Sequence, residues 1–405
     1  MKKVFGAIGN YFRETDKLLL ILCLFACGYG LLLLLITSQS PFMQSGSTAA
    51  LFKIAGFSIN RKMVVQVGAV LLGIIAAIII SNIDYEAITA CWWIIAPIAV
   101  GLMVMTYFFG QDTGAADDKA WLIIPGIGIG FQPSELLKIA FIITFSLHLS
   151  HSGEHLNDPL NLVLLVVHGM IPVGLVALQG DDGTALVFVF IFLAMMFTAG
   201  VKLRYFVVGL SLIVVAIPLF WTYVLKDFQK DRFMIFLHPE SDPLNLGLQQ
   251  NNARMMIGSG QLTGKGIVES GSIKLPEREN DFIFSVAGET FGFLGTLVLI
   301  LILVAILLRI MRISSMAKDS VGSYLCIGMF ATLMAQTFIN IGMNICLMPV
   351  IGVTLPFFSA GGSSTSTLFL GIGLVLSVYI HSRPKTYQEK LHKRYPGRTQ
   401  IKNPI

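Results

Sequence analysis

Charged side chains are scarce in this chain: only 13% of its 405 residues are Asp, Glu, Lys or Arg, whereas 55% are hydrophobic. A water-soluble domain carries charge on about a quarter of its residues. So few charges cannot cover a water-facing surface of this size, which indicates that lipid surrounds most of the molecule. The net charge of +5 is modest, and the basic residues flank apolar segments instead of forming one patch, so nucleic acid is not an expected partner.

Cysteine is also sparse, and its spacing is uninformative. The five cysteines lie in or beside apolar segments and fit neither a zinc site nor a disulfide framework. We interpret them as small packing residues. The sequence has no evident repeat of 20–50 residues, and we find no soluble catalytic domain in it. Any chemistry must therefore use membrane-embedded residues and loops.

Long apolar runs occupy most of the chain. Crossing a hydrocarbon layer about 30 Å thick takes about 20 helical residues. We therefore predict an all-α polytopic membrane protein, and the first run is longer than a signal-peptide core of about 7–15 residues, so we expect it to be retained. The ten predicted spans are residues 18–37, 63–82, 89–109, 134–150, 161–178, 184–200, 203–225, 282–309, 322–345 and 364–381.

Ten crossings put both termini on one side of the membrane, and the distribution of Lys and Arg predicts that this side is the cytoplasm. In this orientation the cytoplasmic segments contain Lys2, Lys3, Arg13, Lys17, Lys202, Arg204, Arg309, Arg312, Lys318 and the basic tail. The short extracytoplasmic loops contain only Lys53, Arg61, Lys62 and Lys119. Residues 1–17 and 382–405 become cytoplasmic segments, the tail lying near anionic headgroups. The long segment 226–281 becomes a large extracytoplasmic loop.

A charged pair opens the fourth predicted span. Glu135 and Lys138 are three residues apart, which places them on one helical face where they can pair. Pro133 suits the first turn of a helix, and Gln132 and Ser134 add polar neighbours. Ionisable residues inside a membrane are costly and indicate function by default. The pair is either a salt bridge that holds the bundle together or the wall of a polar cavity that binds an anionic headgroup.

Two adjacent carboxylates, Asp181 and Asp182, lie in Gly180-Asp-Asp-Gly-Thr184 between the fifth and sixth spans. They suit either a solvated turn or a cation site. A divalent cation such as Mg²⁺ or Mn²⁺ can bridge pyrophosphate and carboxylates, but the sequence contains no legible set of metal ligands.

The large loop is the most polar part of the chain. Arg232 precedes the glycine-rich run Ile257-Gly-Ser-Gly-Gln-Leu-Thr-Gly-Lys-Gly266, where backbone amides and Lys265 can approach a phosphate. The run is not a Walker A loop, because Ser259 and Gly266 occupy positions at which that motif needs Gly and Ser or Thr. It is either a phosphate-contacting loop or simply a compact folded one.

Asp281 ends this loop at the start of the eighth span, and Glu289 lies two turns further along the same face. A carboxylate at a membrane boundary is partly desolvated, which raises its pKa and suits a general base. The alternative role for Asp281 is helix N-cap, a position that favours Asp.

Before the last span, Leu355-Pro-Phe-Phe-Ser-Ala-Gly-Gly-Ser-Ser364 is a non-helical segment that must line a cavity or be buried in protein, so Ser359 and Ser363 join the candidate substrate-binding residues.

Together these segments resemble the SEDS family (shape, elongation, division and sporulation) over residues 15–382. Four motifs carry the resemblance: Gln132-Pro-Ser-Glu-Leu-Leu-Lys138; Gln179-Gly-Asp-Asp-Gly-Thr-Ala185; Ile257-Gly-Ser-Gly260 with Asp281-Phe-Ile-Phe284 and Gly288-Glu289; and Asn340-Ile-Gly-Met-Asn344 with Leu347-Met-Pro349 and Leu355-Pro-Phe-Phe-Ser359 to Gly361-Gly-Ser-Ser364. The Asn-Ile-Gly-Met-Asn run and the Gly-Lys-Gly of the loop favour the elongation (RodA) branch over the division (FtsW) and sporulation (SpoVE) branches. The second motif departs from the usual Pro-Asp-Leu-Gly.

The resemblance implies a peptidoglycan glycosyltransferase of the bacterial cell membrane that polymerises lipid II. The family's essential aspartate corresponds to Asp281, which would take the proton from the acceptor sugar's 4-hydroxyl. Its polar pair corresponds to Glu135 and Lys138, Arg232 would contact the pyrophosphate, and the expected partner is a class B penicillin-binding protein, a transpeptidase. We expect Gln132, Ser134, Lys265, Ser359 and Ser363 to support substrate binding, and Glu289 and Asp181 to support the site.

Two other functions remain open from the sequence. A transporter that flips lipid II would use Glu135 and Lys138 beside a cavity, but it needs a polar path on the cytoplasmic side, where the short loops 83–88 and 151–160 offer little. A non-catalytic scaffold would recruit wall-synthesis partners and would tolerate substitution of Asp281.

Overall fold

A computed structural model describes residues 11, 13–40, 52–54, 57–111, 119–123, 130–225, 227–238, 246–270 and 273–382. Most of the predicted N-terminal segment and the basic tail lie outside the described residues.

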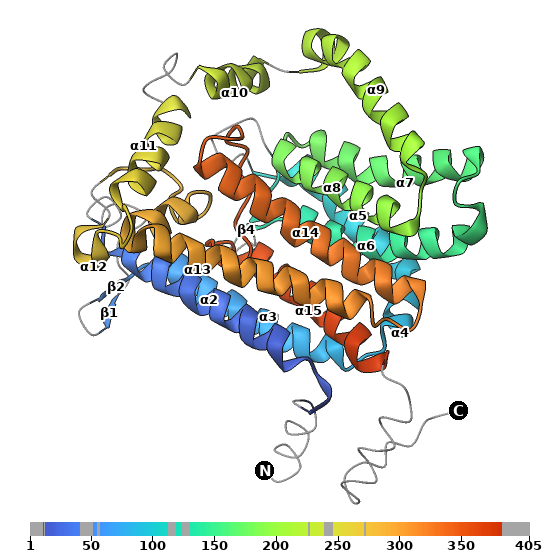
Figure 1. Ribbon diagram of the computed structural model, residues 1–405, viewed down its shortest axis with the longest axis horizontal. Coiled ribbons are helices and arrows are strands. Elements are labelled where there is room, and N and C mark those ends of the chain that lie inside the picture. Colours follow the sequence, from blue (N-terminus) through green and yellow to red (C-terminus); the bar gives the residue numbers. More distant parts are fainter. Residues whose placement is uncertain are drawn as a thin grey trace, which may run out of the picture.

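Within the described residues, ten helices are long and apolar enough to cross a membrane, which confirms the predicted all-α architecture (Figure 1). Eight of them are α2 (Lys17–Ser38), α3 (Arg61–Ser81), α5 (Trp92–Phe109), α7 (Pro159–Ala177), α8 (Asp182–Ala199), α13 (Ile283–Ser314), α14 (Ser320–Asn344) and α15 (Gly362–His381). The other two spans combine α6 (Pro133–Ser152) with the 3₁₀ turn η3 (Gly153–His155), and α9 (Leu203–Leu219) with the π turn η4 (Phe220–Val224).

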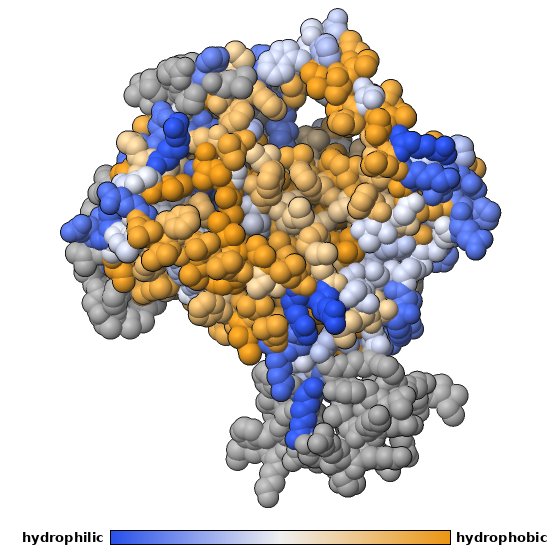
Figure 2. All heavy atoms as spheres, viewed as in Figure 1, coloured by the Kyte–Doolittle hydropathy of each residue, from blue (hydrophilic) through white to orange (hydrophobic). Residues whose placement is uncertain are grey.

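Large apolar side chains cover the outside of the bundle. Figure 2 shows a broad hydrophobic surface over the middle of the molecule, with hydrophilic residues at its margins. On α13, Leu297, Leu301 and Leu308 each expose more than a third of their surface. Leaving so much apolar surface in water is unfavourable, whereas hydrocarbon accommodates it without penalty. The molecule is therefore a multi-pass membrane protein.

The bundle interior is built around α15, which packs along α3, and α14, which packs against α6, α8 and α13. Glycine permits a close approach of α15 to α3: a Cβ atom at Gly373 of α15 would lie 2.9 Å from the Cα atom of Ala77 in α3. Small residues at a helix interface let two backbones approach closely and gain dispersion energy in a membrane, where the hydrophobic effect gives no help.

The large loop contains three helices that the sequence did not predict: α10 (Asp227–Leu237), α11 (Leu246–Ser259) and α12 (Gly266–Glu269). In Figure 1, they follow α9 across the end of the bundle opposite to the first turn of α2 and the last turn of α15. Two short antiparallel hairpins add to the non-membrane structure. They pair β1 (Phe52–Ile54) with β2 (Phe57–Ile59) and β3 (Leu122–Ile123) with β4 (Gly130–Phe131).

Helix α13 is broken near its start, at Gly292, whose φ is +64° and ψ −158°. The break frees backbone N–H groups that a straight helix would satisfy internally. The turn after α11 accepts them: Phe293 N donates to Gln261 O at 2.8 Å, and Leu294 N donates to Leu262 O at 3.1 Å. The glycine-rich run of the loop is thus a compact fold clamped onto α13, because buried backbone groups need partners.

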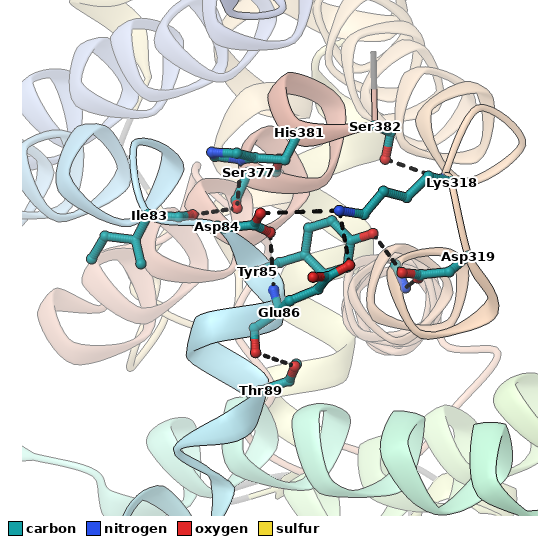
Figure 3. Close-up of polar contacts among 11 residues, drawn as sticks. Ile83, Asp84, Tyr85, Glu86, Thr89, Lys318, Asp319, Ser377, His381 and Ser382 are labelled. Atoms are coloured by element: carbon teal, nitrogen blue, oxygen red, sulfur yellow. Dashed lines mark hydrogen bonds and ion pairs between the residues drawn. The ribbon is translucent and has the colours of Figure 1, made fainter. Parts of the chain in front are cut away.

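A polar cluster joins the opposite end of the bundle, where α4 (Tyr85–Ala90) meets the α13–α14 turn and the end of α15 (Figure 3). The hydroxyl of Tyr85 donates to Asp319 Oδ2 at 2.9 Å, and Lys318 Nζ lies 2.8 Å from Glu86 Oε1. The backbone N–H of Lys318 also donates to Ser382 Oγ. These contacts tie three separate turns of the chain together, far from the glycine-rich loop.

Candidate functional site

A cavity of about 330 Å³ opens at the end of the bundle that carries the large loop. The start of α6, the start of α8, α14, the turn before α13 and the segment between α14 and α15 enclose it. Its polar lining residues are Gln132, Glu135, Asp181, Asp182, Thr184, Gln249, Glu277, Asn280, Asp281, Gln336, Thr354 and Ser364. Residues more than 100 positions apart in the sequence therefore line one cavity, Glu135 and Asp281 among them.

Asp281 is half-buried and sits on a tight turn immediately before α13. Its backbone N–H donates to Glu277 O at 3.0 Å. The N-cap position of α13 is Phe282, and no side chain caps the helix there. The predicted alternative, that Asp281 serves as the N-cap, is therefore wrong, and its carboxylate faces the cavity instead.

Two asparagines of α14 fix the backbone at this position. The side-chain amides of Asn340 and Asn344 both donate to Asp281 O, each at 2.9 Å. Asn340 also donates to Val353 O at 2.7 Å, and Asn344 Oδ1 accepts from Ser285 Oγ at 2.6 Å. A buried, fully bonded amide pair restrains the turn, the start of α13 and the 350–361 segment together.

The 350–361 segment forms the wall beside Asp281. Ser359 Oγ donates to Asn280 O, and Ala360 N donates to Glu279 O at 2.8 Å. Gly352 adopts a φ of +71°, and a Cβ built there would lie 3.9 Å from Asp281 Oδ2. The segment is non-helical and buried in protein, as expected for irregular backbone at this depth. Ser359 thus holds the turn through its backbone and is not among the residues that line the cavity.

The first turn of α6 forms the opposite wall. Glu135 Oε1 accepts from Lys138 Nζ at 2.8 Å, and both side chains are almost fully buried. Glu135 lines the cavity, whereas Lys138 and Ser134 do not. Gln132 lies at the rim and donates through Nε2 to Asp181 Oδ2 at 2.8 Å. The pair is therefore a salt bridge, and Glu135 also contributes to the cavity wall.

The two carboxylates of the Gly-Asp-Asp-Gly turn are both engaged. Asp181 caps α8 by accepting from Thr184 N at 2.9 Å, and Asp182 accepts from Gln229 Nε2 at 2.7 Å. Within the described ranges, no group of three or more His, Cys, Asp or Glu residues is arranged to hold a metal ion.

Glu289 and Lys265 lie together outside the cavity lining. Glu289 is fully buried, with Lys265 Nζ 3.3 Å from its Oε1 and Arg278 Nη2 3.5 Å from its Oε2. Arg278 is itself only 2% exposed and donates to Ser40 Oγ at 3.2 Å. The cluster fastens the glycine-rich turn to the turn that carries Asp281.

The other predicted site residues, Ser363 and Arg232, do not line the cavity in the described part of the structure. Ser363 has a buried hydroxyl without a hydrogen-bond partner, but its neighbour Ser364 is the one that lines the cavity. Arg232 falls in α10, and its side chain lies outside the described part of the structure. Asn340, Asn344 and Gln336 gained no role from sequence reasoning. Asn340 and Asn344 stood in one of the family motifs, and all three are amide side chains inside a strongly apolar span.

The FtsW/RodA/SpoVE family of cell cycle proteins matches residues 17–384. A similar protein is the peptidoglycan glycosyltransferase MrdB of Escherichia coli K12, 33% identical over 327 residues, which cover 78% of this chain and 85% of that one. Another is stage V sporulation protein E of Bacillus subtilis 168, 32% identical over 327 residues, covering 77% and 85%.

Solved structures share the fold. A chain of a peptidoglycan synthase complex, solved to show how polymerization and crosslinking are coordinated, superposes with a TM-score of 0.74 at 24% identity, covering 91% of this chain and 98% of that chain. The rod shape determining protein RodA of Thermus thermophilus superposes with a TM-score of 0.65 at 23% identity, covering 91% and 98%. At this identity the likeness is one of fold.

Proposed function

The chain belongs to the FtsW/RodA/SpoVE family of cell cycle proteins, and we propose that it is a peptidoglycan glycosyltransferase that polymerises lipid II. The observation that carries the proposal is the position of Asp281: its carboxylate faces a cavity whose opposite wall carries Glu135. The name of the Escherichia coli relative, a peptidoglycan glycosyltransferase, supports the reaction class.

Asp281 acts as the general base in this proposal. Its carboxylate takes the proton of the acceptor sugar's 4-hydroxyl while that oxygen forms a bond to the anomeric carbon of the donor. The bond from this carbon to the pyrophosphate oxygen breaks, and undecaprenyl pyrophosphate leaves with the bonding electrons. A base works best when it is held still. Asn340 and Asn344 supply that restraint through the Asp281 carbonyl.

The cavity lies outside the cell in the proposed orientation, with both termini in the cytoplasm. This orientation rests on the excess of Lys and Arg in the segments then inside. It puts Asp281 at the outer boundary of the bacterial cell membrane, where the sugars of a flipped lipid II are accessible. We assign the chain to the elongation branch and expect a class B penicillin-binding transpeptidase as its partner. The presence of the same fold in a peptidoglycan synthase complex supports such a partner.

The test is polymerisation of purified lipid II by the full chain with its transpeptidase partner. Asp281→Asn keeps the side-chain shape and removes the base, so glycan formation should fall about 10³-fold, within the range of general-base catalysis. Asp158→Asn is the matched control, because Asp158 is exposed at the far end of the bundle. Wild-type rates for Asp281→Asn would overturn the mechanism. Headgroup translocation into vesicles without polymer would favour a flippase instead.

A further inference from the structure

The turn that carries Asp281 has a strained backbone. Glu277 adopts a φ of +50°, in the left-handed region that residues other than glycine rarely occupy. Its carbonyl oxygen accepts the backbone N–H groups of Asn280 and Asp281, both at 3.0 Å. A backbone in such a conformation persists only where the surrounding structure holds it. The turn therefore depends on contacts from other elements, and these contacts set the position of Asp281.

The start of α3 provides one of these contacts. Lys62 Nζ lies 2.8 Å from Glu279 Oε1 and 3.7 Å from Glu277 Oε2. The side chain of Glu279 is only 4% exposed, whereas that of Lys62 is 42% exposed. One ammonium group thus joins the carboxylates of two alternate residues of the turn. Asp281 follows two residues after Glu279, so Lys62 restrains the chain immediately before the proposed base.

The next turn of the same helix holds the wall on which the Asp281 turn rests. Gln66 lies four residues further along α3, on the same helical face. Its Nε2 donates to Ser359 O at 3.2 Å, and its Oε1 accepts from Gly361 N at 3.0 Å. The segment bound in this way contacts the turn through Ala360 N, which donates to Glu279 O at 2.8 Å. One face of α3 therefore contacts both the turn and its support.

Arg278 is a second cation near Glu279, but it is engaged elsewhere. Its Nη2 lies 3.5 Å from Glu289 Oε2, and its Nη1 donates to Ser40 Oγ at 3.2 Å. It attracts the Glu279 carboxylate at longer range. Without Lys62, the nearly buried carboxylate of Glu279 would keep only this weaker attraction. Such a state is unfavourable, because a buried charge needs a close partner.

We propose that Lys62 is a positioning residue for the glycosyl transfer: through its ion pair with Glu279 it holds the turn that places Asp281 at the cavity. The inference rests on the proposed function, in which Asp281 is the base. Loss of the ammonium group lets the Glu279 side chain move toward water, and the turn moves with it. Lys62 is not among the residues that line the cavity, so its effect reaches the substrate through the turn.

The experiment measures kcat and KM for lipid II polymerisation by the full chain with its transpeptidase partner. Lys62→Met keeps most of the side-chain length and removes the charge. Its kcat should fall about tenfold or more while KM stays within about twofold, because a displaced base slows the chemical step and not the binding of substrate. Lys62→Arg keeps the charge and should retain most of the wild-type kcat.

A second substitution tests whether Lys62 acts through Glu279. Glu279→Gln keeps the shape of the side chain and removes the buried charge that Lys62 compensates. Neutralising both partners of a buried ion pair is less harmful than removing one. The double variant Lys62→Met/Glu279→Gln should therefore have a higher kcat than Lys62→Met, and its kcat should match that of Glu279→Gln alone.

The matched control is the ion pair between Lys318 and Glu86 at the other end of the bundle, which also measures 2.8 Å (Figure 3). The carboxylate of Asp84 lies 4.0 Å from the same ammonium group, just as that of Glu277 lies 3.7 Å from Lys62. Lys318→Met removes an equivalent charge far from Asp281, so its kcat and KM should equal those of the wild type.

The proposal fails if Lys62→Met retains the wild-type kcat, or if Lys318→Met or Lys62→Arg loses as much kcat as Lys62→Met. It also fails if KM rises while kcat is unchanged, which would mean that Lys62 binds substrate, or if the losses multiply in the double variant. Should Lys62→Met not fold, Lys62→Arg and the comparison of the double variant with Glu279→Gln still decide. Failure of the proposed function looks different: the wild-type chain would not polymerise lipid II, or Asp281→Asn would leave the rate unchanged.

Discussion

Asn344 and Asp281 are joined by a hydrogen bond of 2.9 Å from the side-chain amide of the first to the backbone carbonyl of the second. Asn344 belongs to α14, and Asp281 precedes α13. The bond connects two helices at the point where the proposed base enters the cavity. Because this bond acts on the backbone carbonyl and not on the carboxylate, Asn344 positions the base without taking part in proton transfer.

Asn344→Ala should therefore lower kcat about 10²-fold while KM changes little, since a displacement of about 1 Å at a reacting group has effects of that order. It should also lower the unfolding free energy by about 1–3 kcal/mol, because the Asp281 carbonyl and the Ser285 hydroxyl lose partners. Steady-state lipid II polymerisation and thermal unfolding of the purified protein measure the two effects.

The control for this variant is Asn82→Ala. Asn82 also donates to a backbone carbonyl, that of Ile78, but at the exposed far end of α3. Its polymerisation kinetics should match those of the wild type. An equal fall of kcat in both variants would contradict a positioning role for Asn344.

Glu289 and Arg278 form a buried ion pair, of which the sequence indicated only Glu289. Both side chains are at most 2% exposed, and each is charged. Removing one partner of a buried ion pair is strongly destabilising, by about 3 kcal/mol, even though Lys265 Nζ also lies 3.3 Å from Glu289 Oε1. Glu289→Gln and Arg278→Met should each lower the melting temperature strongly, and the double variant should be more stable than the sum of the two losses implies. Strict additivity in this cycle would show that the two groups do not interact.

The spans were predictable because apolar length alone selects them, but their ends depended on tertiary contacts. The sequence placed the end of the eighth span at residue 309, whereas α13 continues to Ser314. Arg309 is the reason: its Nε donates to Asp16 Oδ2 at 2.7 Å, and Asp16 is 1% exposed. An unpaired arginine would be expected to end a membrane helix, but here the carboxylate of Asp16, the residue before α2, compensates the charge of Arg309.

The loop helices and the break in α13 were less predictable. Helix α11 has little apolar periodicity, and its place depends on packing against α13. The unusual backbone of Gly292 is stabilised by N–H bonds to the Gln261–Leu262 turn, a contact that no local pattern encodes. Sequence reasoning recognised a glycine-rich loop there and left open a phosphate contact. The structure gives those glycines a packing role.

Charged residues of the site could be predicted because charge is rare in this chain, whereas the residues that hold them in place could not. Asp281 and Glu135 stand out in the sequence because they are charges at membrane boundaries. In the structure both residues line one cavity. Lys265 also stood out, but its charge lies against Glu289, outside the lining. Gln336 is an uncharged amide in an apolar span, and only the three-dimensional structure shows that it lines the cavity.

The cluster around Tyr85 should matter for stability and not for polymerisation, because it joins the turns at the end of the bundle opposite the cavity (Figure 3). Burial, together with the neighbouring Asp319 carboxylate, raises the pKa of the Tyr85 hydroxyl, which therefore stays protonated and donating. Tyr85→Phe removes this one bond and should lower the unfolding free energy by about 1 kcal/mol. Glycan synthesis at permissive temperature should be unchanged, and a selective loss of kcat would mean that this end is coupled to the site.

Gly258 and Gly260 provide a matched comparison within the glycine-rich motif Ile257-Gly-Ser-Gly260. A Cβ atom at Gly260 would lie 1.8 Å from the carbonyl oxygen of Gly288 in α13, a distance that forces the two backbones apart. A Cβ at Gly258 would meet nothing within 4 Å, and the residue lies in α11.

Gly260→Ala should lower the melting temperature, because overpacking of this kind typically costs about 1–3 kcal/mol. It should also reduce polymerisation, since the displaced Gly288 adjoins Glu289 and through it the turn of Asp281. Gly258→Ala should be neutral or stabilising by up to about 1 kcal/mol, the difference in helix propensity between the two residues. Thermal unfolding and lipid II polymerisation of both variants check this contrast, and equal behaviour of the two would show that the close approach of the turn to α13 does not set the site geometry.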